Sequence, residues 1–256
     1  MDTPRAEARR VFGERAAMYT TSATHTDPQV LGRVVELACP ERHWIALDIG
    51  TGPGHTAFAV APHLHEVIAI DLTREMLAEA ALLRSKRELP NVELALADAH
   101  NLPCADAAFD LVTCRRTAHH LSDIAGALRE MKRVLRPGGR LVIDDRSVPE
   151  DDFVDACMNE LDRYHDESHV RQYRPSEWRE MLEARGFRVE EVEPYTQHRP
   201  LTSLTDGVSP QNVERIHRVL NGLTDEQRHA LNFVEVDGER HCNHWYVMLS
   251  ARDIAP

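Results

Sequence analysis

The chain has 256 residues and a formal net charge of −12, from 42 acidic and 30 basic side chains. This excess of acid argues against a nucleic-acid-binding protein, because such proteins carry a basic face. No apolar run approaches the roughly 20 residues of a membrane span, and residues 1–5 lack the layout of a signal peptide. Five scattered cysteines without a C-x-x-C pair favour reduced thiols, so we expect a cytoplasmic protein.

In chain order, the first 40 residues predict two helices, over 6–17 and 29–38, separated by a loop rich in Thr and Ser. From residue 44 to about 145, short β-branched runs alternate with helical patterns. This alternation is typical of a doubly wound parallel α/β sheet. Strands are expected at 44–49, 66–70, 92–96, 108–114 and 139–144, and helices at 55–64, 73–87 and 122–136.

The character of the sequence changes after the fifth predicted strand. Residues 149–186 predict two helices rich in charge and histidine, the second beginning at Pro175, which would form a cap over the sheet. The remaining expected elements are a strand at 187–192, helical structure at 209–232, a strand with a hairpin turn at 233–238 and a final strand at 244–249. This last strand would be antiparallel and at or near the sheet edge.

The glycine-rich turn LDIGTGPG (47–54) follows an apolar strand and places three glycines at alternate positions. Such a strand end lets a ligand approach the backbone before the chain turns into a helix. The dinucleotide fingerprint instead spaces its glycines G-x-G-x-x-G. Asp48, two residues before the first glycine, would repel a pyrophosphate but suits a positively charged ammonium group. The turn therefore favours S-adenosylmethionine (SAM) over NAD.

A second acidic residue, Asp71, ends the next predicted strand 21 residues after Gly50. At that spacing a carboxylate can accept hydrogen bonds from ribose hydroxyls, a requirement that NAD and SAM share. Asp98, beyond the third strand, can accept from an adenine amine, and Met76 can pack against the ring. Taken alone, Met76 could be a core residue and Asp98 a helix cap. Together they lie at the carboxyl ends of strands, where ligands bind in such sheets.

These motifs resemble those of the class I SAM-dependent methyltransferases, in particular the small-molecule branch with the ubiquinone and menaquinone C-methyltransferases. The similarity is carried by LDIGTGPG (47–54), AIDLTREML (69–77), LADAHNLPCADAAFDLV (96–112), CRRTAHHL (114–121) and REMKRVLRPGGRLVIDD (129–145). The segments at 12–25, 147–152 and 164–171 are similar to the bacterial YcgJ-like subgroup. The resemblance implies a seven-stranded Rossmann-like methyltransferase sheet with an antiparallel last strand.

On this resemblance the chain divides into four parts: an N-terminal helical lid (1–40), a SAM-binding core (41–148), a helical cap (149–186) and a C-terminal segment that completes the sheet with inserted helices (187–256). The resemblance implies that the 50–54 loop holds the methionine part of SAM and that Tyr19 closes over the cofactor. Tyr19 could instead be an aromatic residue on an amphipathic helix. The expected cofactor-binding residues are Tyr19, His25, Asp48, Gly50, Thr51, Gly52, Gly54, Asp71 for the ribose, Leu72, Met76, Asp98 and Ala99 for the adenine, and Arg115.

Candidate catalytic residues follow the fourth strand or lie in the cap. Methyl transfer mainly requires alignment of the nucleophile, exclusion of water and, where needed, removal of a proton. Histidine is a natural base for a phenol, thiol or carbon acid, and arginine can grip an anionic substrate. The candidates are Arg115, His119, His120, His165 and His169, the last two on one helix face if that helix continues. Most of the 15 histidines are expected on the surface, and His120 could be structural.

Three other chemistries are disfavoured. A metal site from His165, His169 and Asp144 or Asp145 meets no required ligand spacing, so no metal is expected. Arsenic methylation would need a second thiol beside Cys114. The N-P-P-[YFW] signature of enzymes that methylate exocyclic amines of DNA bases is absent after the fourth strand.

We therefore expect a SAM-dependent methyltransferase that moves a methyl group directly to oxygen, carbon or sulfur of a small organic acceptor, leaving S-adenosylhomocysteine. Quinone-like or other aromatic acceptors follow from the resemblance, and a homodimer is one expected assembly. One alternative is a catalytically silent SAM-binding sensor or partner protein. The other is an NAD-dependent oxidoreductase, which the glycine spacing and Asp48 disfavour.

Overall fold

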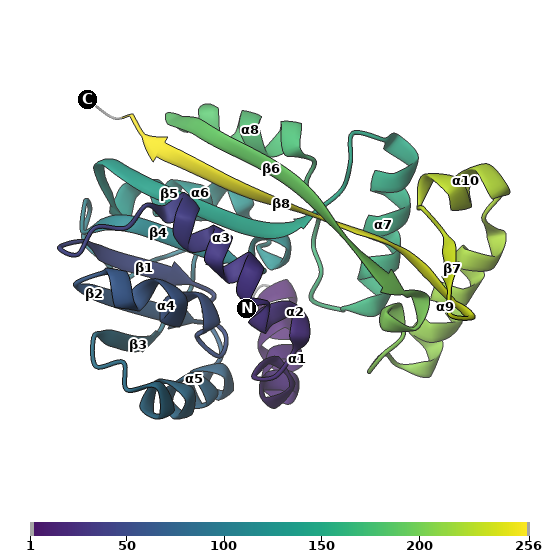
Figure 1. Ribbon diagram of the computed structural model, residues 1–256, viewed down its shortest axis with the longest axis horizontal. Helices are drawn as coiled ribbons and strands as arrows, with labels where there is room; N and C mark the ends of the chain where they lie inside the picture. The colour runs from purple at the N-terminus through teal and green to yellow at the C-terminus, as the bar shows by residue number, and fades with distance from the viewer. Residues whose placement is uncertain (1–2, 255–256) are drawn as a thin grey trace.

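A mixed eight-stranded β-sheet forms the centre of the protein, whose computed structural model describes residues 3–254 (Figure 1). The strand order is β3-β2-β1-β4-β5-β8-β6, and the short β7 pairs with β8 alone. Strands β1 to β5 are parallel neighbours, whereas β8 runs antiparallel to both β5 and β6. The bounds are β1 (Ile45–Ile49), β2 (Glu66–Asp71), β3 (Val92–Leu96), β4 (Phe109–Arg115), β5 (Leu135–Ser147), β6 (Phe187–Pro200), β7 (Val234–Val236) and β8 (Glu239–Asp253).

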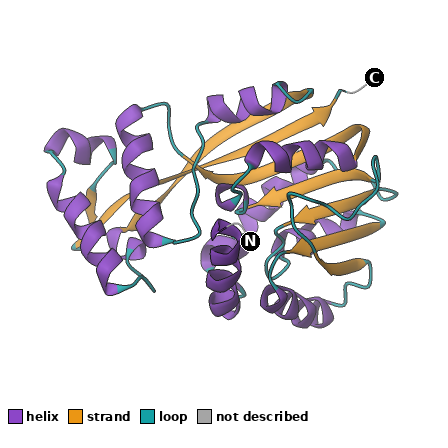
Figure 2. Ribbon diagram, turned by 180° about the vertical axis from the view of Figure 1, so that it is seen from behind, coloured by secondary structure: helices purple, strands orange, loops and turns teal. Residues whose placement is uncertain are grey.

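Helices cover both faces of the sheet (Figures 1 and 2). The first face packs against α3 (Pro28–Ala38), α4 (His55–Val60) and α5 (Arg74–Arg87), and the second against α6 (Ile124–Val134) and α8 (Pro175–Glu183). Each face buries its own apolar cluster, because central strands of a doubly wound sheet are apolar on both sides. The expected α/β class with an antiparallel last strand is confirmed, and β7 adds a short eighth strand.

A smaller outer lobe lies beyond one end of the core sheet. It consists of α7 (Asp152–His165), the 3-10 turn η3 (Leu201–Leu204), α9 (Pro210–Gly222), α10 (Asp225–Ala230) and β7. A third apolar cluster, with members from α7, η3 and α9, holds this lobe together. The two long strands β6 and β8 run from the core sheet into the outer lobe as a twisted ribbon (Figure 1).

Two N-terminal helices, α1 (Thr3–Tyr19) and α2 (Ala23–Thr26), bridge the core and the outer lobe. Arg5 on α1 forms an ion pair with Asp98 at 3.3 Å, and Arg10 forms one with Glu167 at 2.6 Å. Both pairs are partly exposed, so solvent screens the attraction between their charges. The first helix therefore contacts both parts of the molecule, and it also buries Ala8, Val11 and Ala16.

Several expected boundaries are wrong for identifiable reasons. The helix expected to reach residue 136 ends at Val134, because the Pro-Gly-Gly sequence lies inside β5. The helical stretch 209–232 divides into α9 and α10, since Thr224 caps a new helix with a capping box. Strands β6 and β8 are much longer than expected, whereas the expected place of β8 near the sheet edge is confirmed, one strand in. Helix α7 ends at His165, so His169 does not share a helix face with it.

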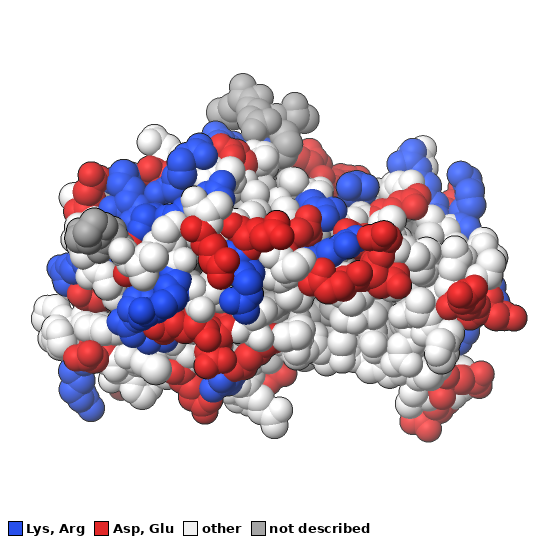
Figure 3. All heavy atoms as spheres, turned by 90° about the horizontal axis from the view of Figure 1, so that it is seen from above, with Lys and Arg blue, Asp and Glu red and all other residues white. Residues whose placement is uncertain are grey.

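The other structural features are consistent with the composition. Within residues 3–254, no helix combines the length and apolar character needed to cross a membrane. Basic and acidic side chains are interspersed over the face shown in Figure 3. All five cysteines are free thiols.

The packing of α6 on the sheet gives a stability prediction. Leu128 on this helix is completely buried in the core cluster, so Leu128→Ala should lower the free energy of unfolding by about 2–5 kcal/mol. Leu82→Ala is the matched control, because Leu82 is 59% exposed and its truncation should cost less than about 0.5 kcal/mol. Urea unfolding followed by circular dichroism measures both, and equal losses would contradict this account of the core.

Candidate active site

Two adjoining cavities open where the parallel strands end. The first, which we call the loop cavity, has a volume of about 960 Å³, part of it open to solvent, and is bounded by the 50–54 turn, α1, α2 and the ends of β2 and β4. The second, which we call the histidine cavity, has a volume of about 1210 Å³, also partly open to solvent, between the core sheet, α1 and the outer lobe. Five residues line both cavities and form the wall between them: Phe12, Tyr19, His25, Arg116 and His120.

The glycine turn at the floor of the loop cavity needs its glycines. Gly50 has φ +64°, and a Cβ there would lie 2.3 Å from the Oγ1 of Thr117. That hydroxyl donates a hydrogen bond to the Gly50 carbonyl at 3.1 Å. At Gly52 (φ +53°), a Cβ would meet nothing nearer than the Met76 sulfur at 3.9 Å, so this backbone is open to a ligand.

Asp71 connects the turn to the next strand. One of its carboxylate oxygens accepts from the Gly52 amide at 2.8 Å, and the other accepts from the Thr73 amide at 2.9 Å. Burial raises the pKa of Asp71, and these two hydrogen bonds oppose that rise because they favour the ionised form. The carboxylate therefore both shapes the glycine turn and lines the loop cavity.

Arg115, the last residue of β4, lies in the loop cavity with its guanidinium almost fully buried. Its Nε donates to the Thr56 hydroxyl at 2.8 Å and its Nη2 to the His25 carbonyl at 2.7 Å. Its Nη1 makes no hydrogen bond, although it lies 3.8 Å from the Asp144 carboxylate, and the hydroxyl of Thr51 also lacks a hydrogen-bond partner. A buried guanidinium with a free donor fits a carboxylate ligand such as the amino-acid end of SAM.

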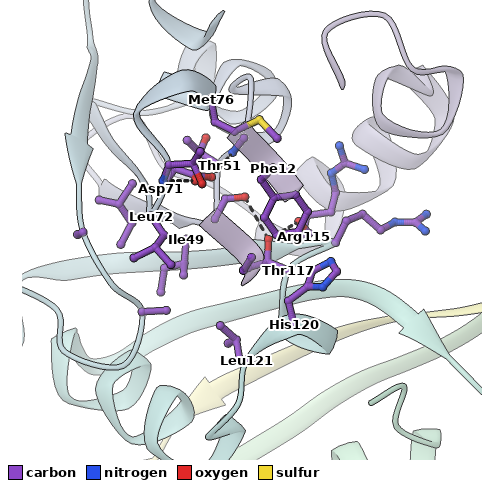
Figure 4. A pocket seen from close by; sticks show the side chains of 18 of the residues that line it. Phe12, Ile49, Thr51, Asp71, Leu72, Met76, Arg115, Thr117, His120 and Leu121 are labelled. Carbon is purple, nitrogen blue, oxygen red and sulfur yellow. Dashed lines mark hydrogen bonds between the residues drawn. The ribbon is translucent and has the colours of Figure 1, made fainter. Parts of the chain in front are cut away.

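The far end of the loop cavity has the features of a nucleoside site. Asp98 accepts from the His100 amide at 2.9 Å and its ring nitrogen at 2.7 Å. Leu72, Met76 and Ala99 supply apolar walls. In Figure 4, Asp71 and Met76 lie toward one end of this cavity and His120 toward the other, with Phe12 of α1 between them.

The structure does not place every expected cofactor residue on the cavity wall. Asp48 lies beneath the turn, where its Oδ1 accepts from the Thr113 hydroxyl at 2.6 Å, and burial raises its pKa to about 6. Gly54 packs against Phe58 instead of facing the cavity. Both positions therefore shape the turn from behind. The expected residues that do line the loop cavity are Tyr19, His25, Gly50, Thr51, Gly52, Asp71, Leu72, Met76, Asp98, Ala99 and Arg115.

Of the five catalytic candidates, His119 has the arrangement of a general base. The fully buried Asp145 accepts from the backbone amide of His119 at 3.1 Å and from its Nδ1. Burial alone would raise the pKa of Asp145, but the neighbouring His119 holds it below its ordinary value. Because Nδ1 donates its proton to Asp145, the Nε2 of a neutral His119 carries the lone pair.

The other histidines are held in different ways. Burial, reinforced by the neighbouring His119, lowers the pKa of His120 to about 4, and its ring meets Phe12 edge-on at 4.8 Å. Burial lowers the pKa of His169 to about 3, and its Nε2 lies 3.2 Å from the Asn159 amide oxygen. The Nδ1 of His165 lies 3.0 Å from the Leu204 carbonyl. Arg115 lines the loop cavity but not the histidine cavity.

Sequence reasoning missed several residues of these cavities. Asp145 was considered only as a metal ligand, although its place at the end of β5, beside β4, is a signal that it can reach His119. Within residues 3–254 no group of three or more His, Cys, Asp or Glu side chains is arranged to hold a metal ion. The other missed lining residues come from distant segments: Phe12, His55, Thr56, Arg116, Thr117, Arg146, Arg199, Ser203, His244 and Tyr246.

Comparison with known proteins gives concordant results. A family model described as a methyltransferase domain matches residues 47–143. The methyltransferase YcgJ of Bacillus subtilis strain 168 is 36% identical over 220 residues, which cover 85% of this chain and 87% of YcgJ. The demethylmenaquinone methyltransferase of Thermotoga maritima is 40% identical over 114 residues, covering 43% of this chain and 47% of that protein. The YcgJ crystal structure superposes with a TM-score of 0.82 at 31% identity, covering 88% and 98% of the two chains.

The free donor of Arg115 gives a binding prediction. If Nη1 binds the amino-acid carboxylate, Arg115→Gln should weaken S-adenosylhomocysteine binding by about 10- to 100-fold, as expected for a lost charge-assisted hydrogen bond. Binding of 5′-methylthioadenosine, which lacks the amino-acid group, should be almost unchanged and also reports correct folding. Isothermal titration measures both ligands, and an equal loss for the two would exclude this role.

Proposed function

The chain belongs to the SAM-dependent methyltransferase family that includes YcgJ, and on that premise we propose that it methylates a small organic acceptor bound in the histidine cavity. The observation that carries this proposal is the shared wall of the two cavities. The loop cavity suits the cofactor, and the second cavity, beside it, is deep enough for a small molecule. His119 lines that second cavity, and Asp145 holds the His119 ring from behind through a hydrogen bond.

The residues of the loop cavity fit the cofactor piece by piece. We assign the free Nη1 of Arg115 and the hydroxyl of Thr51 to the amino-acid end, Asp71 to the ribose and the surface of Leu72, Met76 and Ala99 to the adenine. When bound, SAM supplies a methyl group made electrophilic by its positively charged sulfur. The open backbone at Gly52 provides the close approach that such a ligand needs.

The first helix and its neighbour would exclude water from the reaction. Phe12, Tyr19 and His25 form a chain of edge-to-face rings, with centroids 6.1 Å apart for the first pair and 4.8 Å for the second. All three line both cavities, so they cover the place where the two ligands would meet. Methyl transfer benefits from this enclosure, because water is excluded and the reacting groups stay aligned.

His119 is our candidate for the proton acceptor. Its Nε2 would take a proton from an acidic group of the acceptor, and Asp145 would stabilise the resulting imidazolium by a buried hydrogen bond. His120, whose pKa is lowered to about 4, stays neutral at pH 7 and packs at the cavity wall. Acceptors of this kind carry a dissociable proton on oxygen, sulfur or an activated carbon.

A rate comparison tests the role of His119. Once a panel of phenols, thiols and carbon acids has yielded a turnover assay for S-adenosylhomocysteine, His119→Gln should lower kcat by about 10²- to 10⁴-fold. Its affinity for S-adenosylhomocysteine should stay within a factor of about two, because His119 does not line the loop cavity. The control is His229→Gln, on exposed surface of the outer lobe, which should leave kcat unchanged.

The Asp145→Asn variant tests whether Asp145 assists His119 as a base or only packs against it. Loss of the carboxylate should lower kcat and shift the acidic limb of the kcat–pH profile, since the imidazolium is no longer stabilised. A profile with an unchanged acidic limb would exclude Asp145 as the partner of the base. If no acceptor in the panel is methylated by a protein that binds SAM, the silent binding protein becomes the better reading.

A further inference from the structure

One end of the histidine cavity gathers hydrogen-bond donors that have no acceptor. Three buried donor atoms lack a partner there: the Nε of Arg146, the Nε2 of His244 and the Oγ of Ser203. One buried acceptor of the same cavity, the Oδ1 of Asp162, also lacks a hydrogen-bond partner, while its other oxygen pairs with Arg146. Arg199 lines the cavity as well, and no ion pair of its guanidinium is found within residues 3–254. We call Arg146, Arg199, Ser203 and His244 the donor cluster. Buried polar groups in native proteins are nearly always satisfied, so such a concentration calls for an explanation.

The strand pairing places the donor cluster on one face of the β6–β8 ribbon. Arg146 on β5 pairs with Tyr246 on β8, and His244 lies two residues before Tyr246 on the same face. Arg199 on β6 pairs with Cys242, two residues further along that face. Ser203 follows directly in η3. The four groups therefore converge although they come from four different elements.

The tautomer of His244 can be assigned from its neighbour. The Nη2 of Arg146 lies 3.4 Å from the Nδ1 of His244, and a guanidinium can only donate. Burial, together with the charge of Arg146, holds the pKa of His244 well below its ordinary value, so the ring is neutral. Its Nδ1 is then the acceptor and its unpartnered Nε2 carries the proton. All three unpartnered atoms of the donor cluster are donors.

The donor cluster holds two guanidinium groups, and the lining of the whole histidine cavity also includes the carboxylates of Asp162, Asp166 and Asp206. Arg146 has a carboxylate partner, Asp162 at 2.6 Å, but Asp162 also accepts from Gln172. Within the described residues Arg199 forms no ion pair, and Arg15, which lines the same cavity, donates to the Gly207 carbonyl at 3.1 Å. Neutral donors beside unpaired guanidinium groups are the surroundings that proteins use to bind oxygen anions.

We propose that the donor cluster binds an oxyanion carried by the methyl acceptor, either a carboxylate or a phosphate ester. This inference rests on the proposed function, because it takes the acceptor to occupy the histidine cavity. The cluster lies at the outer-lobe end of the cavity, whereas His120 lies at the wall shared with the loop cavity. An anion held at one end would turn the reacting atom of the acceptor toward the cofactor, so the cluster sets both specificity and orientation.

Binding to the protein saturated with S-adenosylhomocysteine tests this inference without turnover. The probes are benzoate, phenyl phosphate and the neutral benzyl alcohol, each measured by isothermal titration. At least one acid should bind about 10-fold or more tightly than the alcohol. Arg199→Gln should remove that preference by weakening the acid about 10- to 100-fold. Tighter binding of benzoate identifies a carboxylate acceptor, and tighter binding of phenyl phosphate identifies a phosphate ester.

The matched control is Arg240→Gln, which makes the same change of charge on an exposed part of β8 outside the histidine cavity. It should change acid binding less than twofold. The inference is overturned if benzyl alcohol binds as tightly as both acids, or if the two arginine variants behave alike. Because S-adenosylhomocysteine affinity is measured on every sample, failure of the cofactor site is recognised separately from failure of the donor cluster.

Discussion

Both cavities depend on the contacts of one buried carboxylate, that of Asp144. It lies 3.8 Å from Arg115 and 3.2 Å from Arg116, and it accepts a 2.7 Å hydrogen bond from the Tyr195 hydroxyl. One carboxylate thus positions an arginine of the loop cavity, an arginine of the shared wall and a tyrosine of the β6–β8 ribbon. Two buried guanidinium groups share one direct ion-pair partner, which leaves positive charge where the cofactor carboxylate would bind. Removing such a buried partner typically costs 3–5 kcal/mol.

The division of the molecule into core sheet and outer lobe explains how one sheet serves two ligands. Parallel strands β1, β2 and β4 end together and present backbone and carboxylate groups to a nucleoside-like ligand. The antiparallel ribbon continues past that edge and carries polar residues toward the outer lobe, where α7 and η3 also line the histidine cavity. The first part carries the cavity that we assign to the cofactor, and the second part adds the cavity in which we propose that the acceptor binds.

Much of the core could be predicted from sequence, because buried parallel strands are short β-branched runs between helices. Strand β3 occupies the expected residues 92–96. Asp71 and Arg115 line the loop cavity, as expected for cofactor-binding residues. The ribbon could not be predicted: residues 193–200 of β6 and 239–243 of β8 are mostly exposed or half-buried, so the apolar signal disappears there. The His119–Asp145 contact and the donor cluster depend on strand order, which local patterns do not contain.

The central claim is that the loop cavity is built for SAM and not for a dinucleotide. The most direct test is isothermal titration of the purified protein with S-adenosylhomocysteine, with NAD as the control ligand. We expect 1:1 binding of S-adenosylhomocysteine with a dissociation constant of about 1–10 µM, in the range of −8 kcal/mol, and no measurable heat with NAD. Binding of NAD with no response to S-adenosylhomocysteine would contradict the account of the glycine turn, of Asp71 and of Arg115.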